Sequence, residues 1–270
     1  MAESVQTGLV KATQVAREAV MQRAPNGVRY AAYGDTSITA PDLARMVQAV
    51  PVAIAGALTR KAYYFVPLAM SSANLHSSKL DLQGDNRNDL NPDTTMIASA
   101  YTPELGDQAI CHRNATLPDH DGVFISTRLL SDRFALAFEF FINIGHAFVD
   151  SAGVPESFTD LAWSQAVADV RGETSQDAWE SRSFALSPAP ADGKPRIDEK
   201  AKTEYIEAAF SDAIAIYLLS LAVDFDYSEL REREYPLLAP QPLAERLRLV
   251  AKLFPPNPGY DFSIRYRRRP

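Results

Sequence analysis

Residues 133–150 read RFALAFEFFINIGHAFVD, a segment that is apolar on nearly every side when it is drawn as a helix. Such all-round apolarity is typical of a helix enclosed in a protein core. Asp132 can cap its first turn, and Gly153 and Pro155 can end it. The sequence therefore predicts a buried helix over residues 133–151, and this helix is the centre of the expected fold.

Polar side chains interrupt this segment at spacings of four, three and four residues: Glu139, Asn143, His146 and Asp150. On a helix of 3.6 residues per turn they project from one side. A buried carboxylate without a partner is costly or takes up a proton, so the set needs mutual hydrogen bonds, a neighbouring element, water or a metal. Gly145 costs about 1 kcal/mol relative to alanine in a helix. Its presence indicates that another backbone or a ligand approaches closely.

Helical and strand patterns recur along the rest of the chain. Helices are expected at 4–23, 41–50 with a continuation to Leu58 beyond Pro51, 157–170, 199–223 and 242–254. Strands are expected at 28–33, 62–69, 95–101, 108–112 and 123–126. Long loops are expected at 71–93 and 172–195, and Pro67 should make its strand an edge strand or shorten it. The predicted fold class is mostly α (α+β), with a few short strands, in a single domain of residues 1–270.

Charge and composition exclude several classes of function. A net charge of -7 does not suit a nucleic-acid binder, and the basic segment 265–269 is interpreted as a solvated tail. The most apolar runs, 47–58 and 214–223, are shorter than the roughly 20 residues that cross a bilayer. Cys111 is the only cysteine, so no intramolecular disulfide forms. We therefore expect a cytoplasmic protein that binds neither nucleic acid nor membrane.

The predicted helix at 199–223 carries a second group of polar residues. Glu204 and Ser211 are seven residues apart on one face, with the small Ala208 between them, whereas Glu207 is expected to face solvent. Adjacent Cys111 and His112 are not expected to form a catalytic pair, because neighbours in sequence are not thereby placed in contact.

Residues 142–150, INIGHAFVD, and 204–210, EYIEAAF, resemble the metal-binding helices of zincin metallopeptidases of the anthrax lethal factor type. That family carries HExGHAxD on one helix and EFFAEAF on a later one. The resemblance covers about residues 118–217, and includes the turn and strand 119–126 before the first helix. It implies a zincin-like helical domain in which His146 and Glu204 would be metal ligands.

The chain departs from the family at two decisive positions. The first zinc histidine falls on Ile142 and the catalytic glutamate on Asn143, and neither residue can do that chemistry. The resemblance therefore implies a catalytically degenerate pseudopeptidase with a binding or regulatory role, no cofactor, a peptide or protein partner, and no identified catalytic residue. Two alternatives stay open. One is a helical structural or interaction protein without metal. The other is an enzyme in which Glu139 joins His146 and Glu204 around a divalent metal, with Mn or Fe suiting so many oxygens better than Zn.

Overall fold

The computed structural model describes residues 9–67, 69–71, 96–98, 109–128, 130, 132–186, 197–230 and 235–265. These divide into two compact units. The first consists of Met1–Gln48 and Thr59–Glu139, and the second of Ala49–Leu58 and Phe140–Pro270. That residues 1–270 form a single domain stays a prediction.

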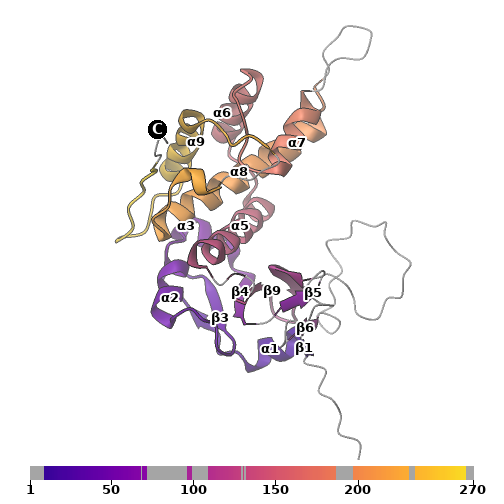
Figure 1. Ribbon diagram of the computed structural model, residues 1–270, viewed down its shortest axis with the longest axis vertical. Coiled ribbons are helices and arrows are strands. Elements are labelled where there is room, and N and C mark those ends of the chain that lie inside the picture. The colour runs from indigo at the N-terminus through magenta and orange to yellow at the C-terminus, as the bar shows by residue number, and fades with distance from the viewer. Residues whose placement is uncertain are drawn as a thin grey trace, which may run out of the picture. The chain divides into compact units, whose positions relative to one another are not determined.

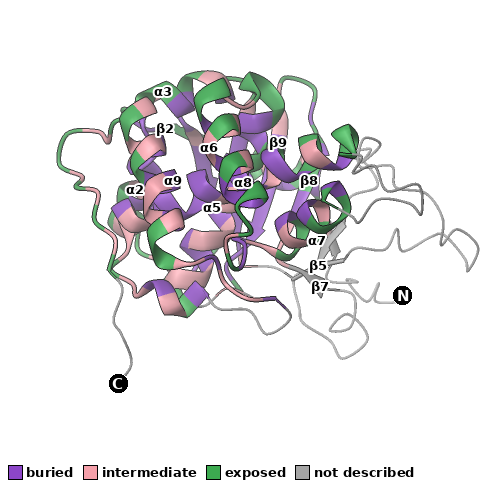
Figure 2. Ribbon diagram, turned by 90° about the horizontal axis from the view of Figure 1, so that it is seen from above, coloured by how far each residue is buried: buried purple, intermediate pink, exposed green. Residues whose placement is uncertain are grey.

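The first unit is built on a five-stranded mixed sheet (Figure 1). Its order is β2 (Gln22–Arg23), β3 (Arg29–Ala32), β4 (Lys61–Val66), β9 (Asp121–Ser126) and β8 (His112–Thr116). The three inner strands are parallel, and the two outer strands are antiparallel to their neighbours. In Figure 2, β9 is coloured mostly as buried, whereas buried and exposed residues alternate along β8. The outer strand therefore has one solvent-facing side.

A smaller antiparallel sheet belongs to the same unit. Its order is β1 (Leu9–Lys11), β6 (Met96–Ala98), β5 (Ala69–Ser71) and β7 (Ala109–Ile110). The predicted strands at 95–101 and 108–112 correspond to β6 and to β7 with the start of β8.

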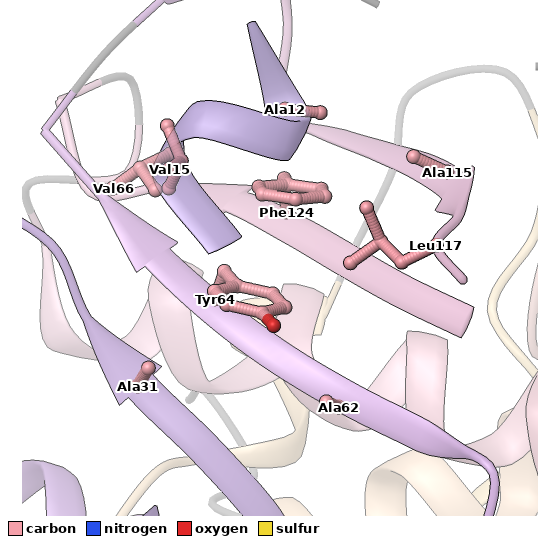
Figure 3. Packing of buried hydrophobic residues seen from close by; sticks show 9 residues of the cluster. All are labelled: Ala12, Val15, Ala31, Ala62, Tyr64, Val66, Ala115, Leu117 and Phe124. Atoms are coloured by element: carbon pink, nitrogen blue, oxygen red, sulfur yellow. The ribbon is translucent and has the colours of Figure 1, made fainter. Parts of the chain in front are cut away.

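One part of the core of the first unit lies between helix α1 (Ala12–Glu18) and one face of the five-stranded sheet. Figure 3 shows Ala12 and Val15 of α1 above side chains from β4, β8 and β9. The rings of Tyr64 and Phe124 stack with their centroids 4.7 Å apart. Helix α2 (Ala40–Gln48) follows β3, and the Asp42 N–H donates to the Thr39 hydroxyl at 3.3 Å, which caps the start of the helix.

Helices make up the second unit. They are α3 (Val52–Ala55), the 3-10 turn η1 (Gly56–Leu58), α5 (Arg133–Ala152) from Phe140 onward, α6 (Glu156–Val167), α7 (Gln176–Ala185), α8 (Glu199–Ala222), the 3-10 turn η2 (Tyr227–Leu230) and α9 (Pro240–Leu253). Helices α6, α7 and α9 pack against helix α8. It is the one helix in the described ranges long and apolar enough to cross a membrane, but 72% of its most apolar window is buried inside the protein. That burial is the property of a core helix.

The segment that contains α3 is attached to the C-terminal region of the chain. The Asn257 side chain donates to the Val50 carbonyl at 2.8 Å and accepts from the Val52 N–H at 3.1 Å. One amide group therefore satisfies two backbone groups beside Pro51, which interrupts the helical stretch as the sequence predicts.

The mostly helical α+β class is confirmed, and the differences have local causes. Of the expected helix 4–23, residues 9–23 are described, and within them α1 is the one helix, between β1 and β2. Strand β4 ends at Val66, so Pro67 shortens it, as expected. The strand is nevertheless central in its sheet, which is possible because Pro67 follows the last residue pair between β4 and β9. Helix α7 lies inside the expected loop 172–195 and is capped by the Ser175 hydroxyl. Of the expected loop 71–93, only Ser71 is described, as the last residue of β5, and residues 266–269 of the basic tail lie outside the described residues.

Candidate functional site

Between Glu139 and Asp150, the side chains of helix α5 that reach solvent lie on one side of the helix. Glu139 and Ile142 are of intermediate exposure, and His146 and Asp150 are exposed. Their spacings of three and four residues place them on one side of the helix. Asn143 is 8% exposed and belongs to the buried side. The four polar residues are therefore not buried together: Glu139, His146 and Asp150 lie on the side along which this apolar helix meets water, and Asn143 lies on the buried side.

The predicted metal ligands His146 and Glu204 are both exposed. Glu204 pairs with Lys200 on its own helix, with 3.5 Å between Oε1 and Nζ. An interior pocket that holds both side chains is therefore not found, although their ligation of one ion stays a prediction. Within the described ranges no group of three or more His, Cys, Asp or Glu side chains is placed to hold a metal.

The close approach of another backbone explains why residue 145 is a glycine, as predicted from the presence of a glycine inside a helix. A methyl group there would lie 2.5 Å from the backbone oxygen of Ser211 and 2.9 Å from its hydroxyl. Ser211, on α8, is 1% exposed. Glycine at this position allows α5 and α8 to pack backbone to backbone, which leaves no room for a ligand between them.

Glu139 has a partner that the sequence did not indicate. Its Oε1 contacts Nδ1 of His112, the first residue of β8, in a short hydrogen bond. The His112 side chain is 40% exposed and that of Glu139 is 17% exposed. Because the carboxylate fixes the proton on Nδ1, the other ring nitrogen of a neutral His112 is an acceptor. The pair lies within the first unit and joins the outer strand to the first turns of α5.

Cys111 immediately precedes this pair and is half-buried. Burial raises the pKa of its thiol, and the negative charge of Glu139 raises it further. The thiol therefore stays protonated at neutral pH and is a poor nucleophile. The prediction that Cys111 and His112 do not form a catalytic pair agrees with this electrostatic environment.

Backbone groups along the outer edge of β8 point away from its partner strand β9. The Ser126 N–H donates to the Cys111 carbonyl and the Leu117 N–H to the His120 carbonyl, each at 2.8 Å. Bonded and non-bonded residues alternate in an antiparallel pair. The residues that turn their N–H and C=O groups away from β9 are thus His112, Asn114 and Thr116. Among the described strands, β9 is the only one paired with β8.

His120, in the turn between β8 and β9, is engaged by Tyr64. Its Nε2 lies 2.7 Å from the Tyr64 hydroxyl. Burial lowers the pKa of His120, and the charge of Arg29 lowers it further, against the opposing effects of Asp119 and Asp121. A neutral imidazole can accept a hydrogen bond from the tyrosine hydroxyl, so we interpret the contact between His120 and Tyr64 as structural.

In the second unit, a fully enclosed ionic network links several helices. The Glu173 carboxylate is 0% exposed and lies 3.1 Å from Arg182 and 3.0 Å from Arg246. The Tyr205 hydroxyl donates to Glu173 at 2.9 Å, and the Arg246 Nε donates to Gln165 at 2.8 Å. A buried charge of this kind requires partners on every side, and here each charged group has them. The network is structural and out of reach of a solvent-borne substrate.

Asp212 lies next to this network on α8, where the Thr174 hydroxyl donates to its Oδ2 at 2.7 Å. Burial raises the pKa of Asp212 to about 6, although hydrogen bonds from Ser175 and Thr174 oppose the rise. Because the folded state holds the proton more tightly than the unfolded state, this carboxyl stabilises the fold fully below pH 3.8, and that contribution is lost as the pH rises to about 6.

We therefore expect the free energy of unfolding of Asp212→Asn, minus that of wild type, to increase by about 1 kcal/mol between pH 5 and pH 7.5. Asparagine keeps the shape of the side chain but does not titrate. Urea unfolding at the two pH values measures the change. The matched control is Asp160→Asn on exposed Asp160 of α6, for which we expect no such change. A pH-independent difference for Asp212→Asn would show that its carboxyl titrates normally.

Comparison with known proteins adds no family assignment. No family model matches the chain, and no curated protein is detectably similar to it. The class that the structure defines is a mostly helical α+β protein, and its function has to be inferred from the site.

Proposed function

We propose that this chain is a zincin-like protein with a degenerate peptidase centre, and that it binds an extended peptide along the outer edge of β8. The observation that carries the proposal is the row of outward backbone groups at His112, Asn114 and Thr116. An exposed strand edge is a template on which another extended chain adds a strand. The His112–Glu139 pair beside this edge would supply a polar contact to the bound chain.

We base the proposal of a degenerate peptidase centre on the sequence of helix α5. Ile142 and Asn143 stand where the family has a zinc ligand and a general base. Glu139, which could have supplied a displaced ligand, is engaged by His112. Binding without hydrolysis is therefore the function that we propose for this chain. Because Cys111 is the sole cysteine, we propose that this binding takes place in the reducing cytoplasm.

The most direct test removes one backbone N–H that points away from β9 and leaves the side chains that pack on the buried face of the sheet unchanged. Asn114 is exposed, and proline is tolerated on an edge strand where its N–H would face solvent. We expect Asn114→Pro to weaken binding to peptides selected from a random-sequence array by about tenfold, because one backbone hydrogen bond is lost and the added strand is displaced. Fluorescence anisotropy with labelled peptides measures the affinity.

Asn114→Ala is the matched control, since it removes the side chain and keeps the N–H. It should bind as wild type does, and both variants should keep the wild-type melting temperature. Equal binding by Asn114→Pro, or no peptide bound by the wild type, would overturn the proposal. Stoichiometric metal in the purified protein, lost in His146→Ala, would instead favour the enzyme with a reshaped metal site.

A further inference from the structure

A cavity of about 410 Å³ lies in the second unit between α9, η2 and the C-terminal segment. Its size is in the lower part of the range of about 300–1,000 Å³ that is usual for small-molecule sites. The residues that line it are Tyr227, Pro240, Leu243, Ala244, Arg248, Phe262, Ser263 and Ile264. Most of these are apolar, so the cavity suits a hydrocarbon chain or ring.

Helix α9 forms one wall of the cavity through a regular pattern. Pro240, Ala244 and Arg248 are four residues apart and share one side of the helix. The small side chain of Ala244 lies in the middle of this row and leaves the space that the cavity occupies. Other positions of α9, Arg246 and Leu247, are fully buried.

The opposite wall is the segment that contains Phe262, and it is fastened to the rest of the second unit. The Phe262 ring meets Tyr217 edge-on, with centroids 5.3 Å apart. The Tyr227 N–H donates to the Arg265 carbonyl at 3.1 Å, and the Arg265 guanidinium lies 2.5 Å from Asp224. The wall is therefore held at several points.

Polar side chains in the cavity lining are few: Tyr227, Ser263 and Arg248, of which only Arg248 is a charged group. The Tyr227 hydroxyl is occupied by the Leu238 carbonyl at 2.9 Å, so this residue offers its ring. Arg248 is exposed and makes no ion pair with any described residue. A guanidinium at the mouth of an apolar cavity is complementary to a carboxylate that carries an apolar body.

We propose that this cavity binds a monocarboxylate with a medium-length hydrocarbon chain, whose carboxylate pairs with Arg248 and whose chain lies against Ala244 and Phe262. This site is separate from the edge of β8 and does not depend on peptide binding.

Decanoate is the probe, titrated into the full chain by calorimetry below its micelle concentration. We expect decanoate to bind at least tenfold more tightly than decanol, because only the acid can pair with Arg248. Affinity should rise along the series from hexanoate to decanoate by up to about fourfold per methylene, as each one is withdrawn from water.

Variants separate the charge from the cavity. Arg248→Gln should bring decanoate to the affinity of decanol, whereas Arg248→Lys, which keeps the charge, should retain most of the difference. Ala244→Phe fills the space and should abolish binding of both, with wild-type circular dichroism as the check on folding. Equal binding by wild type and Ala244→Phe would overturn the proposal. So would recruitment to phosphatidylglycerol vesicles without any binding of monomeric decanoate, since that result assigns the surface to a membrane.

Discussion

The Glu173→Ala variant is expected to lose about 3–5 kcal/mol of its free energy of unfolding, because two buried guanidinium groups would be left without their carboxylate. Arg246 is 0% exposed and Arg182 5% exposed, so water cannot replace the lost partner without opening the helices around it. The Tyr205 hydroxyl, which also donates to Glu173, would lose its acceptor.

Tryptophan fluorescence during urea unfolding measures this loss selectively. Both tryptophans, Trp163 in α6 and Trp179 in α7, belong to the second unit, so the signal reports on the part of the chain that contains the network. The control is Glu180→Ala on the exposed side of α7, where we expect a change within about 0.5 kcal/mol. A loss below 1 kcal/mol for Glu173→Ala would mean that the charges are already hydrated in the native protein.

The Gly172→Ala variant is expected to lose about 3 kcal/mol, from backbone strain and overpacking together. Gly172 has φ +84°, and a methyl group there would lie 2.2 Å from the Leu237 oxygen and 2.5 Å from the Pro236 oxygen. These are backbone atoms of a segment bonded to Glu173, which accepts from Leu238 and donates to Pro236. They cannot move aside without breaking those bonds.

Gly153 provides a control that separates the two causes. Its φ is +70°, but nothing lies within 4 Å of the position that a methyl group would take. Gly153→Ala should therefore show only the conformational cost, about 1 kcal/mol. If both variants lose the same free energy in urea unfolding, the close approach at Gly172 contributes nothing and the expectation for Gly172 is wrong.

Local signals were sufficient for much of the fold. The cap at Asp132 is present, with the Ala135 N–H donating to its Oδ2 at 3.0 Å, and the Gly145 backbone contact follows from a glycine in a long helix. Helix α8 was also predicted nearly in full. The cap and the extent of α8 depend on residues within a few positions of each other, for which helix geometry alone fixes the neighbours. The close approach at Gly145 was indicated by the glycine itself, whereas its partner Ser211 was not.

Features that depend on tertiary context were not predictable in the same way. Helix α7 has no strong apolar periodicity, since its buried face is made of alanines and Arg182. The pairing of His112 with Glu139 spans 27 residues, and no local pattern connects a strand residue to a helix residue at that separation. The exposure of His146 depends on which side of α5 is left uncovered, which an almost uniformly apolar helix does not reveal.

The attachment of Asn257 to Val50 and Val52 has a consequence for the order of events during translation. These partners are 207 and 205 residues apart, so the α3 segment leaves the ribosome long before the amide that satisfies its backbone has been synthesised. Contacts between such distant parts of a chain form late and slow the completion of folding. A nascent polypeptide that stops short of this asparagine therefore leaves the two backbone groups beside Pro51 without their amide partner.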